Sequence, residues 1–114
     1  MFSFAIWDEK NKSLFAARDR FGVKPFYYTK YKSSIAFSSE IRPLLQLKKS
    51  PEPNVHIWSG YFANGEYSQG ANTFWKEINA LEPGHCLTIS EGQIRIKSWY
   101  NFIDSILHIK DQLP

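Results

Sequence analysis

The sequence predicts an α+β fold in which a few short helices accompany mostly antiparallel β-sheets. Short apolar runs follow one another across polar turns, as the strands of hairpins do. Helix-like segments are few, and they do not alternate with strands in the way that parallel sheets require. Aromatic residues make up 17% of the 114 residues, and such side chains suit a pleated surface. We expect about six strands and two or three short helices.

The first part of the chain predicts two antiparallel hairpins. Their strands are residues 2–8 and 13–18, joined by Glu9–Lys12, and residues 25–31 and 34–38, joined by Lys32-Ser33. The first strand is apolar on both faces apart from Ser3, so we expect it to be buried. It also starts where a chain usually carries a few polar residues. Either this strand forms unaided at a sheet edge, or further sequence normally precedes it.

Two helices are expected after the second hairpin. Ser39 is placed to cap the first, Glu40 suits the positive end of its dipole, and Pro43 keeps it short. Asn54 is placed to cap the second, after a loop at residues 48–53. The second helix covers residues 55–63, ends at Asn64-Gly65, and places Val55, Trp58, Tyr61 and Phe62 on one apolar face.

The last part of the chain predicts a third hairpin and a terminal helix. In order we expect an exposed loop at residues 66–72, a short turn capped by Thr73, a Pro-Gly turn at Leu81–Gly84, and strands at residues 85–90 and 93–100 joined by Glu91-Gly92. Beyond Asn101, apolar residues lie on one side of a helix that has no place in the sheets. Residues 102–114 are therefore interpreted as the start of a linker.

Composition and charge exclude several classes of function. The formal net charge is +3 and the lysines are dispersed, which predicts a solvated surface with no nucleic-acid partner. Cys86 is the single cysteine and the three histidines lie far apart, so no metal site is expected. No apolar run approaches the length of a membrane span, and no basic lead or signal sequence is visible. We expect a cytoplasmic protein without a membrane partner.

A charged segment, Arg18–Tyr28, joins the first two hairpins. Gly22 is placed to adopt a positive φ, and Pro25 fixes its own φ near −65°. Charges between two strands predict either a turn braced by its own side chains or a segment that touches substrate.

The carboxylates allow both interpretations. In the bracing interpretation, Asp19 and Glu40 neutralise nearby arginines, namely Arg18, Arg20 or Arg42. In the chemical interpretation, Asp8, Asp19 and Glu40 supply paired carboxylates for acid–base work.

Several blocks of sequence together resemble the glutaminase domain of class II glutamine amidotransferases, specifically that of glutamine-hydrolysing asparagine synthetases. The blocks occur in the family's order and cover about residues 1–101. They are residues 1–8 (MFSFAIWD), 14–28 (LFAARDRFGVKPFYY), 37–45 (FSSEIRPLL), 73–78 (TFWKEI), 81–85 (LEPGH) and 99–100 (WY). The resemblance implies a four-layer αββα fold of the N-terminal-nucleophile hydrolase type, of which this chain matches the carboxy-terminal half.

The resemblance also implies a mechanism. A cysteine at the mature amino terminus attacks the side-chain amide of glutamine, and its free α-amino group accepts the proton. An Asn side chain and a Gly amide stabilise the oxyanion, while an Arg and an Asp hold the amino-acid end of the substrate. The released ammonia passes to a synthetase domain, which uses ATP and Mg²⁺ and belongs to a homodimeric enzyme.

In that family every one of these glutaminase groups lies upstream of the segment that matches residues 1–8. We therefore expect no catalytic, substrate-binding or metal-binding residue and no cofactor in residues 1–114, and partners that supply the amino-terminal half and the synthetase domain. The residues that match family motifs are expected to be structural. They are Arg18, Asp19, Arg20, Gly22, Pro25, Glu40, Pro83 and Gly84.

No residue of the chain is an evident substitute for the missing groups. Cys86 and His85 are neighbours in a strand, so their side chains point to opposite faces and cannot act as nucleophile and base. Cys86 is interpreted as a packed thiol, and His56 and His85 as structural or surface residues. Asn64-Gly65-Glu66 is similar to the family's oxyanion-hole residues but follows a helix, so we interpret it as a chance similarity.

A second hypothesis is a self-standing β module that binds a sugar or single-stranded nucleic acid by stacking on exposed rings. It requires several exposed aromatic residues in a row beside lysines. The amidotransferase hypothesis instead expects five aromatic residues to be buried and apolar surface to remain where the other half-domain belongs. The five are Phe4, Trp7, Phe15, Phe26 and Tyr28.

Overall fold

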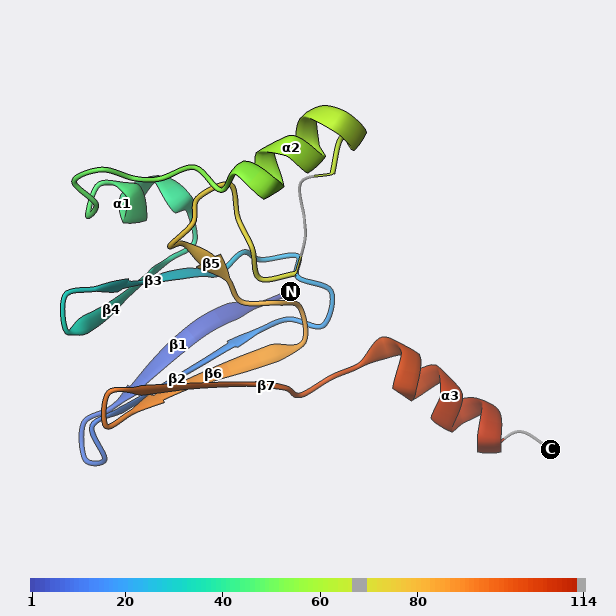
Figure 1. Ribbon diagram of the computed structural model, residues 1–114. Coiled ribbons are helices and arrows are strands. Elements are labelled where there is room, and N and C mark those ends of the chain that lie inside the picture. The colour runs from blue at the N-terminus through green and yellow to red at the C-terminus, as the bar shows by residue number, and fades with distance from the viewer. Residues whose placement is uncertain (67–69, 113–114) are drawn as a thin grey trace. The chain divides into compact units, whose positions relative to one another are not determined.

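The computed structural model describes residues 1–66 and 70–112, and it confirms the α+β class with antiparallel sheets and short helices (Figure 1). The described residues form two sheets, one of four strands in the order β1-β2-β6-β7 and one of three in the order β4-β3-β5. The chain divides into two compact units, and each is described by itself. Unit 1 holds residues 1–23 and those from Pro83 onward, and unit 2 holds Lys24–Glu82.

Unit 1 contains the first and last predicted hairpins, and both are confirmed. Its strands are β1 (Ser3–Asp8), β2 (Ser13–Arg18), β6 (His85–Ser90) and β7 (Gln93–Ser98). All neighbouring strands pair antiparallel, and β2 pairs with β6. Leu87 lies opposite Ile96 and is 1% exposed, so this unit contributes to the apolar core through its central strands.

The expected burial of the first strand is wrong. Phe4 is 39% exposed, Trp7 is 53% exposed and Phe15 is 41% exposed, whereas Phe26 and Tyr28 are buried as expected. For Phe4 and Trp7 the physical reason is the position of β1 at an edge of the sheet, where among the described residues it has β2 as its one neighbour. Phe15 belongs to the inner strand β2, and its ring lies beside that of Phe4, 6.0 Å away between centroids. A strand that is apolar on both faces reads as buried in the sequence, but an edge position leaves part of that surface open.

Unit 2 contains the second predicted hairpin and two helices. Its elements are β3 (Tyr27–Tyr31), β4 (Ser34–Ser38), α1 (Ile41–Leu45), α2 (Val55–Asn64) and β5 (Asn79–Ala80). The two-residue strand β5 was not expected, and it pairs with β3 opposite Tyr27 and Tyr28. It is too short to show an alternating pattern, so only its partner strand reveals it.

One of the two predicted helix caps is correct. Asn54 accepts a hydrogen bond from the amide of Ile57 at 3.4 Å and caps α2. The predicted cap of α1 at Ser39 is wrong, and so is the place of Glu40 inside the first turn. Glu40 itself precedes the helix with φ −129° and ψ 152°, without a side-chain cap. The amide of Glu40 donates to the hydroxyl of Ser38 at 3.1 Å. The hydroxyl that contacts the backbone before α1 therefore belongs to Ser38, one residue before the predicted cap at Ser39.

The apolar face predicted for α2 is not the face that is buried. Ile57 is the buried residue of this helix, whereas Val55 is 68% exposed and Phe62 is 77% exposed. The rings on the predicted face contact one another and Phe74, with the Trp58 and Phe74 centroids 4.4 Å apart. Mutual contact of aromatic side chains therefore takes the place of burial in the core.

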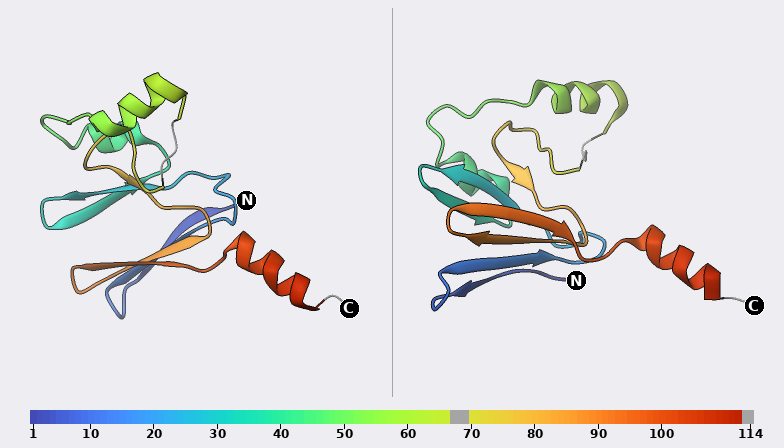
Figure 2. Two further views of the ribbon diagram at one scale, coloured as in Figure 1. Left: turned by 45° about the vertical axis from the view of Figure 1, so that its right-hand side comes forward. Right: turned by 60° about the horizontal axis from the view of Figure 1, so that its bottom comes forward.

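The terminal helix is confirmed as α3 (Phe102–Gln112), which begins where the Asn101 side chain accepts from the amides of Ile103 and Asp104. It extends away from the strands of unit 1, and none of its residues is buried (Figure 2). No helix in residues 1–66 and 70–112 is long and apolar enough to cross a membrane. Part of the predicted loop at 66–72, residues 67–69, lies outside the described residues.

Three hairpin tips carry a non-glycine residue in the left-handed region. Lys12 has φ 51°, Lys32 has φ 55° and Glu91 has φ 51°. Each sits at a turn that the sequence predicts, between β1 and β2, β3 and β4, and β6 and β7. A Cβ atom makes this conformation unfavourable, so these tips are held by the strands that they connect.

Candidate functional site

The family-motif residues of unit 1 gather around the turn that follows β2, residues 19–23, which we call the Asp19 turn. Asp19 is 5% exposed, and its carboxylate accepts hydrogen bonds from three backbone amides. Oδ2 accepts from Phe2 at 3.2 Å, and Oδ1 accepts from Phe21 at 3.2 Å and from Val23 at 2.8 Å. A buried carboxylate satisfied in this way braces backbone from two places in the chain.

The backbone of Asp19 extends the same set of contacts. Its amide donates to the Phe2 carbonyl at 2.9 Å, and its carbonyl accepts from the amides of Gly84 at 2.8 Å and Gly22 at 3.3 Å. Asp19 therefore joins the start of β1, its own turn and the turn before β6. The β1–β2 pair and β6 are therefore tied to this residue at one end of the sheet.

Two glycines are required by the close packing at this point. Gly22 has φ +67°, as the sequence predicts, and a Cβ there would lie 2.6 Å from Cγ of Pro83. Gly84 also has φ +67°, and its Cβ would lie 2.6 Å from the carbonyl oxygen of Tyr100. The Gly84 carbonyl accepts from the amides of Trp99 at 2.8 Å and Tyr100 at 3.1 Å. Gly84 thus connects the Asp19 turn to the segment that leads into α3.

The arginines of the motif make other contacts. Arg18 donates from Nη2 to the Gly22 carbonyl at 2.9 Å, and its own carbonyl accepts from Nε1 of Trp99 at 3.1 Å. The Arg20 guanidinium lies 5.0 Å from the centre of the Tyr100 ring. The Phe21 ring contacts Tyr100 and Phe102 at the start of α3. Trp99 and Tyr100 are therefore parts of this cluster, although the sequence marked them only as a matching block.

The expected bracing by an ion pair is wrong for Glu40. The acceptor contacts of Asp19 given above are to backbone amides, which side-chain charge patterns cannot show. Glu40 and Arg42 form no ion pair within residues 1–66 and 70–112. Glu40 and Pro25 belong to unit 2, which is described by itself.

A pocket of about 510 Å³ opens beside the Asp19 turn within unit 1. Its lining is mostly apolar, and the Asp19 oxygens are engaged with amides, which supports bracing over acid–base work at this place. The lining residues are Met1, Phe2, Asp19, Arg20, Phe21, Val23 and Trp99.

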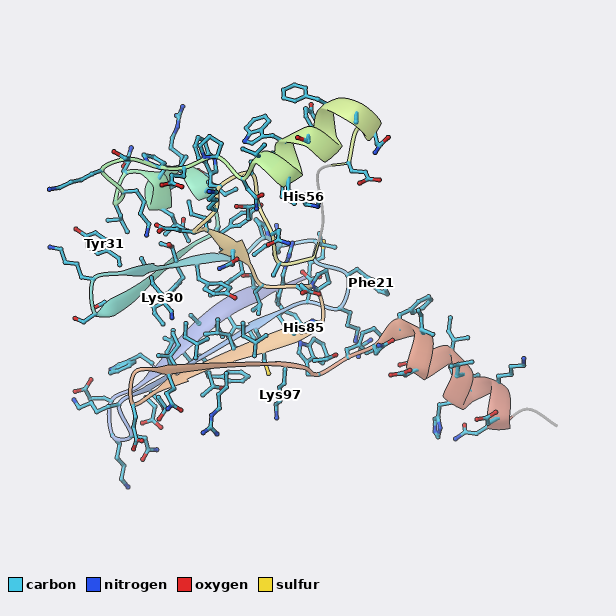
Figure 3. All side chains as sticks on the ribbon, viewed as in Figure 1. Phe21, Lys30, Tyr31, His56, His85 and Lys97 are labelled. Carbon is cyan, nitrogen blue, oxygen red and sulfur yellow. The ribbon has the colours of Figure 1, made fainter. Side chains whose placement is uncertain are left out.

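The remaining candidate residues from the sequence lie in surroundings that give them structural roles. Cys86 is 4% exposed and lies opposite Ala17 and Lys97 in the sheet. Nδ1 of His85 lies 2.8 Å from the Pro83 carbonyl oxygen, while His56 is exposed (Figure 3). Gly65 of Asn64-Gly65-Glu66 ends α2, where its amide donates to the Tyr61 carbonyl at 2.8 Å.

Asp8 and Glu9 belong to the tip of the first hairpin. Hydrogen bonds from the backbone amide and side chain of Asn11 lower the pKa of Asp8 below its ordinary 3.8. Contacts with Lys12 and Trp7 lower the pKa of Glu9. Asp8 is half-buried and Glu9 is exposed. Contacts within the turn favour the charged form of both carboxylates, so both side chains stabilise the hairpin.

A row of rings lies on one face of unit 1. The Phe2 centroid is 5.9 Å from that of Trp99 and 5.6 Å from that of Phe4, which is 6.0 Å from Phe15. These rings are each about 40% exposed. The amidotransferase hypothesis expects apolar surface but expects Phe4 and Phe15 to be buried, whereas the stacking hypothesis needs such a row of exposed rings.

Comparison with known proteins gives a family. Residues 1–100 match the family described as glutamine amidotransferase domain. Asparagine synthetase [glutamine-hydrolyzing] 3 of Bacillus subtilis (strain 168) is 40% identical over 105 residues, and synthetase 2 of the same organism is 33% identical over 115 residues. Amidase chry2 of Gibberella zeae is 33% identical over 86 residues.

These alignments cover 89%, 94% and 75% of the chain but only 17%, 15% and 12% of the respective relatives. The chain therefore spans a small part of the length of the curated relatives that it matches. Within that span, the match includes the residues of the Asp19 turn and the Pro83-Gly84 turn. The chain belongs to the glutamine amidotransferase domain family, in the form found in glutamine-hydrolysing asparagine synthetases.

Proposed function

We propose that residues 1–114 are part of the glutaminase domain of an asparagine-synthetase-like enzyme. The domain hydrolyses glutamine, and the ammonia passes to a synthetase domain that makes asparagine with ATP and Mg²⁺. The observation that carries the proposal is the family match over residues 1–100, which includes the cluster around Asp19. The role of this part is to form the sheet and turns that support the catalytic groups.

The catalytic groups are proposed to come from sequence upstream of the segment that matches residues 1–8. There a cysteine thiolate attacks the amide carbon of glutamine, ammonia leaves, and water hydrolyses the resulting thioester to release glutamate. The thiol of this chain does not suit that role, because Cys86 is 4% exposed and sits inside a strand. We therefore expect no ammonia from glutamine when residues 1–114 are assayed alone.

The same hypothesis proposes the domain boundaries, the partners and the compartment of the enzyme. Residues 1–101 belong to the glutaminase domain, and residues 102–114 begin the connection to the synthetase domain. The partners are the amino-terminal half of the glutaminase domain and the synthetase domain, in an enzyme that forms a homodimer. We also propose the cytoplasm as its compartment, in line with a single cysteine in the sequence.

A chimaera tests the proposal. The matching segment of B. subtilis asparagine synthetase 3 is replaced by residues 1–101, and release of ammonia from glutamine is measured together with asparagine synthesis from either glutamine or free ammonia. We expect all three activities. The proposal is wrong if the chimaera makes asparagine from free ammonia, which shows a folded synthetase domain, but releases no ammonia from glutamine.

A matched control makes the result specific. The same chimaera with Gly84→Val places a branched side chain where a Cβ would lie 2.6 Å from the Tyr100 carbonyl oxygen. We expect it to lose glutaminase activity and to keep synthesis from free ammonia. Steady glutamine hydrolysis by residues 1–114 alone would contradict the upstream location of the catalytic groups.

The row of rings on unit 1 favours a second candidate, binding of a sugar or single-stranded nucleic acid by stacking. Against it, the rings of Phe2 and Phe4 are inclined at 39° and those of Phe4 and Phe15 at 49°, so they pack on one another. A retardation assay with oligonucleotides separates the two candidates. A shift abolished by Phe4→Ala would favour the stacking candidate.

A further inference from the structure

We propose that Asp19 is a positioning residue for glutamine hydrolysis, because it fixes the backbone at the point where the chain enters β1. This inference rests on the proposed function, in which the catalytic groups precede β1. Asp19 touches no substrate in this account. It acts through the backbone of residue 2.

Asp19 holds residue 2 at two points. Its carboxylate accepts from the Phe2 amide at 3.2 Å, and its own amide donates to the Phe2 carbonyl at 2.9 Å. These two bonds lie just before the first residue of β1, so they extend the pairing of β1 with β2 by one position. They fix both the position and the direction of the backbone that arrives from upstream.

Asp19 is itself held in place by further hydrogen bonds. The other carboxylate oxygen of Asp19 is bound to the amides of Phe21 and Val23, and its carbonyl is bound to the amide of Gly84. Because Asp19 is 5% exposed, water does not readily replace these partners. The strand entry is therefore tied to the turn before β6 as well as to β2.

An aspartate at position 19 suits the hydrogen-bond donors around it. An aspartate offers acceptor oxygens only, and the amides of Phe2, Phe21 and Val23, which face its carboxylate, are N–H donors. Asparagine has the same size but replaces one acceptor by an N–H₂ donor, which must oppose an amide N–H in either orientation. In the proposed function, the groups that hold glutamine and the group that attacks it both precede β1. A displacement of about 1 Å can cost about a hundredfold, and a loosened strand entry therefore weakens the binding of glutamine as well as its hydrolysis.

The test uses Asp19→Asn in the chimaera described above. We expect the KM for glutamine to rise at least about tenfold, while synthesis from free ammonia stays within about twofold. The control is Thr29→Val in unit 2. Thr29 is 1% exposed and donates to the Glu77 carbonyl at 2.7 Å, so this variant also loses a buried hydrogen bond. We expect its KM for glutamine to stay within about twofold.

A second pair of variants covers the case in which Asp19→Asn does not fold. Phe2→Ala keeps the backbone amide that binds Asp19, whereas Phe2→Pro removes that amide. We expect a raised KM for glutamine in Phe2→Pro beyond that of Phe2→Ala.

The outcomes separate the inference from the proposed function. Equal KM values in Asp19→Asn and Thr29→Val, or in Phe2→Pro and Phe2→Ala, overturn the positioning role while the unsubstituted chimaera remains an active glutaminase. An unsubstituted chimaera without glutaminase activity overturns the proposed function, and this inference with it.

Discussion

Two kinds of turn in unit 1 differ in what surrounds them. At the Asp19 turn, backbone, a buried carboxylate and two glycines from distant parts of the sequence meet within hydrogen-bond distance. At the Glu91-Gly92 tip, a Cβ added to Gly92 would meet no atom within 4 Å. Both turns use a positive φ. The comparison teaches that similar turn sequences can be either a local connection or a junction of several segments.

The largest effect that this comparison predicts is at Gly84. Gly84→Ala must adopt φ +67° and also displace the Tyr100 carbonyl, 2.6 Å from the new Cβ. We expect a loss of roughly 3 kcal/mol in the free energy of unfolding, measured by urea denaturation of residues 1–114.

Gly92→Ala is the matched variant at the open turn. It has φ +75° with free space around the Cβ, so we expect a loss of about 1 kcal/mol. Equal losses in the free energy of unfolding for Gly84→Ala and Gly92→Ala would mean that the close contacts at Gly84 do not affect stability.

A smaller effect is expected for the indole N–H of Trp99. Trp99→Phe keeps a ring beside Phe2 but removes the hydrogen bond to the Arg18 carbonyl at 3.1 Å, which costs about 1 kcal/mol. Trp7→Phe removes the corresponding bond to Glu9, on the exposed tip of the first hairpin, and we expect less than half of that loss. Thermal unfolding followed by circular dichroism measures both, and the reverse order would contradict the comparison.

The smallest effect concerns pH at the first hairpin tip. The folded state lowers the pKa of Asp8 below 3.8, because Asn11 donates to it from backbone and side chain. Its contribution to stability is therefore present above pH 3.8 and is lost as the pH falls through the lower folded value.

Asp8→Asn should accordingly cost a small amount of stability at neutral pH and none below the folded pKa, so that it removes a small part of the acid dependence of unfolding. A titration of the side-chain carboxyl by nuclear magnetic resonance measures the shift. A folded pKa at or above 3.8 would show that the turn does not favour the charged form.

Much of the fold follows from local patterns in the sequence. The hairpins at Glu9–Lys12, Lys32-Ser33 and Glu91-Gly92 were predicted because polar tips separate clear strands. The Asn54 cap and the positive φ of Gly22 were predicted because each depends on a residue and its neighbours. These features need no knowledge of the rest of the chain.

The errors concern relations between distant segments. The exposure of Phe4 depends on which strand lies beside β1, and the orientation of α2 depends on Phe74, far along the sequence. The role of Asp19 depends on backbone amides, which every residue except proline has and which no side-chain pattern marks. Family resemblance identified Asp19 and Gly84 as motif residues, and the structure supplied the contacts that connect them.

The left-handed conformation of Glu91 has a consequence for engineering this domain. Glu91 precedes Gly92 at an open tip, and an Asn-Gly pair is the sequence that such a two-residue hairpin turn prefers. Glu91→Asn would relieve an unfavourable torsion without altering any contact of Asp19 or Gly84. The more stable Glu91→Asn variant would be a better sample for crystallography and spectroscopy, and the contacts around Asp19 and Gly84 would stay the same.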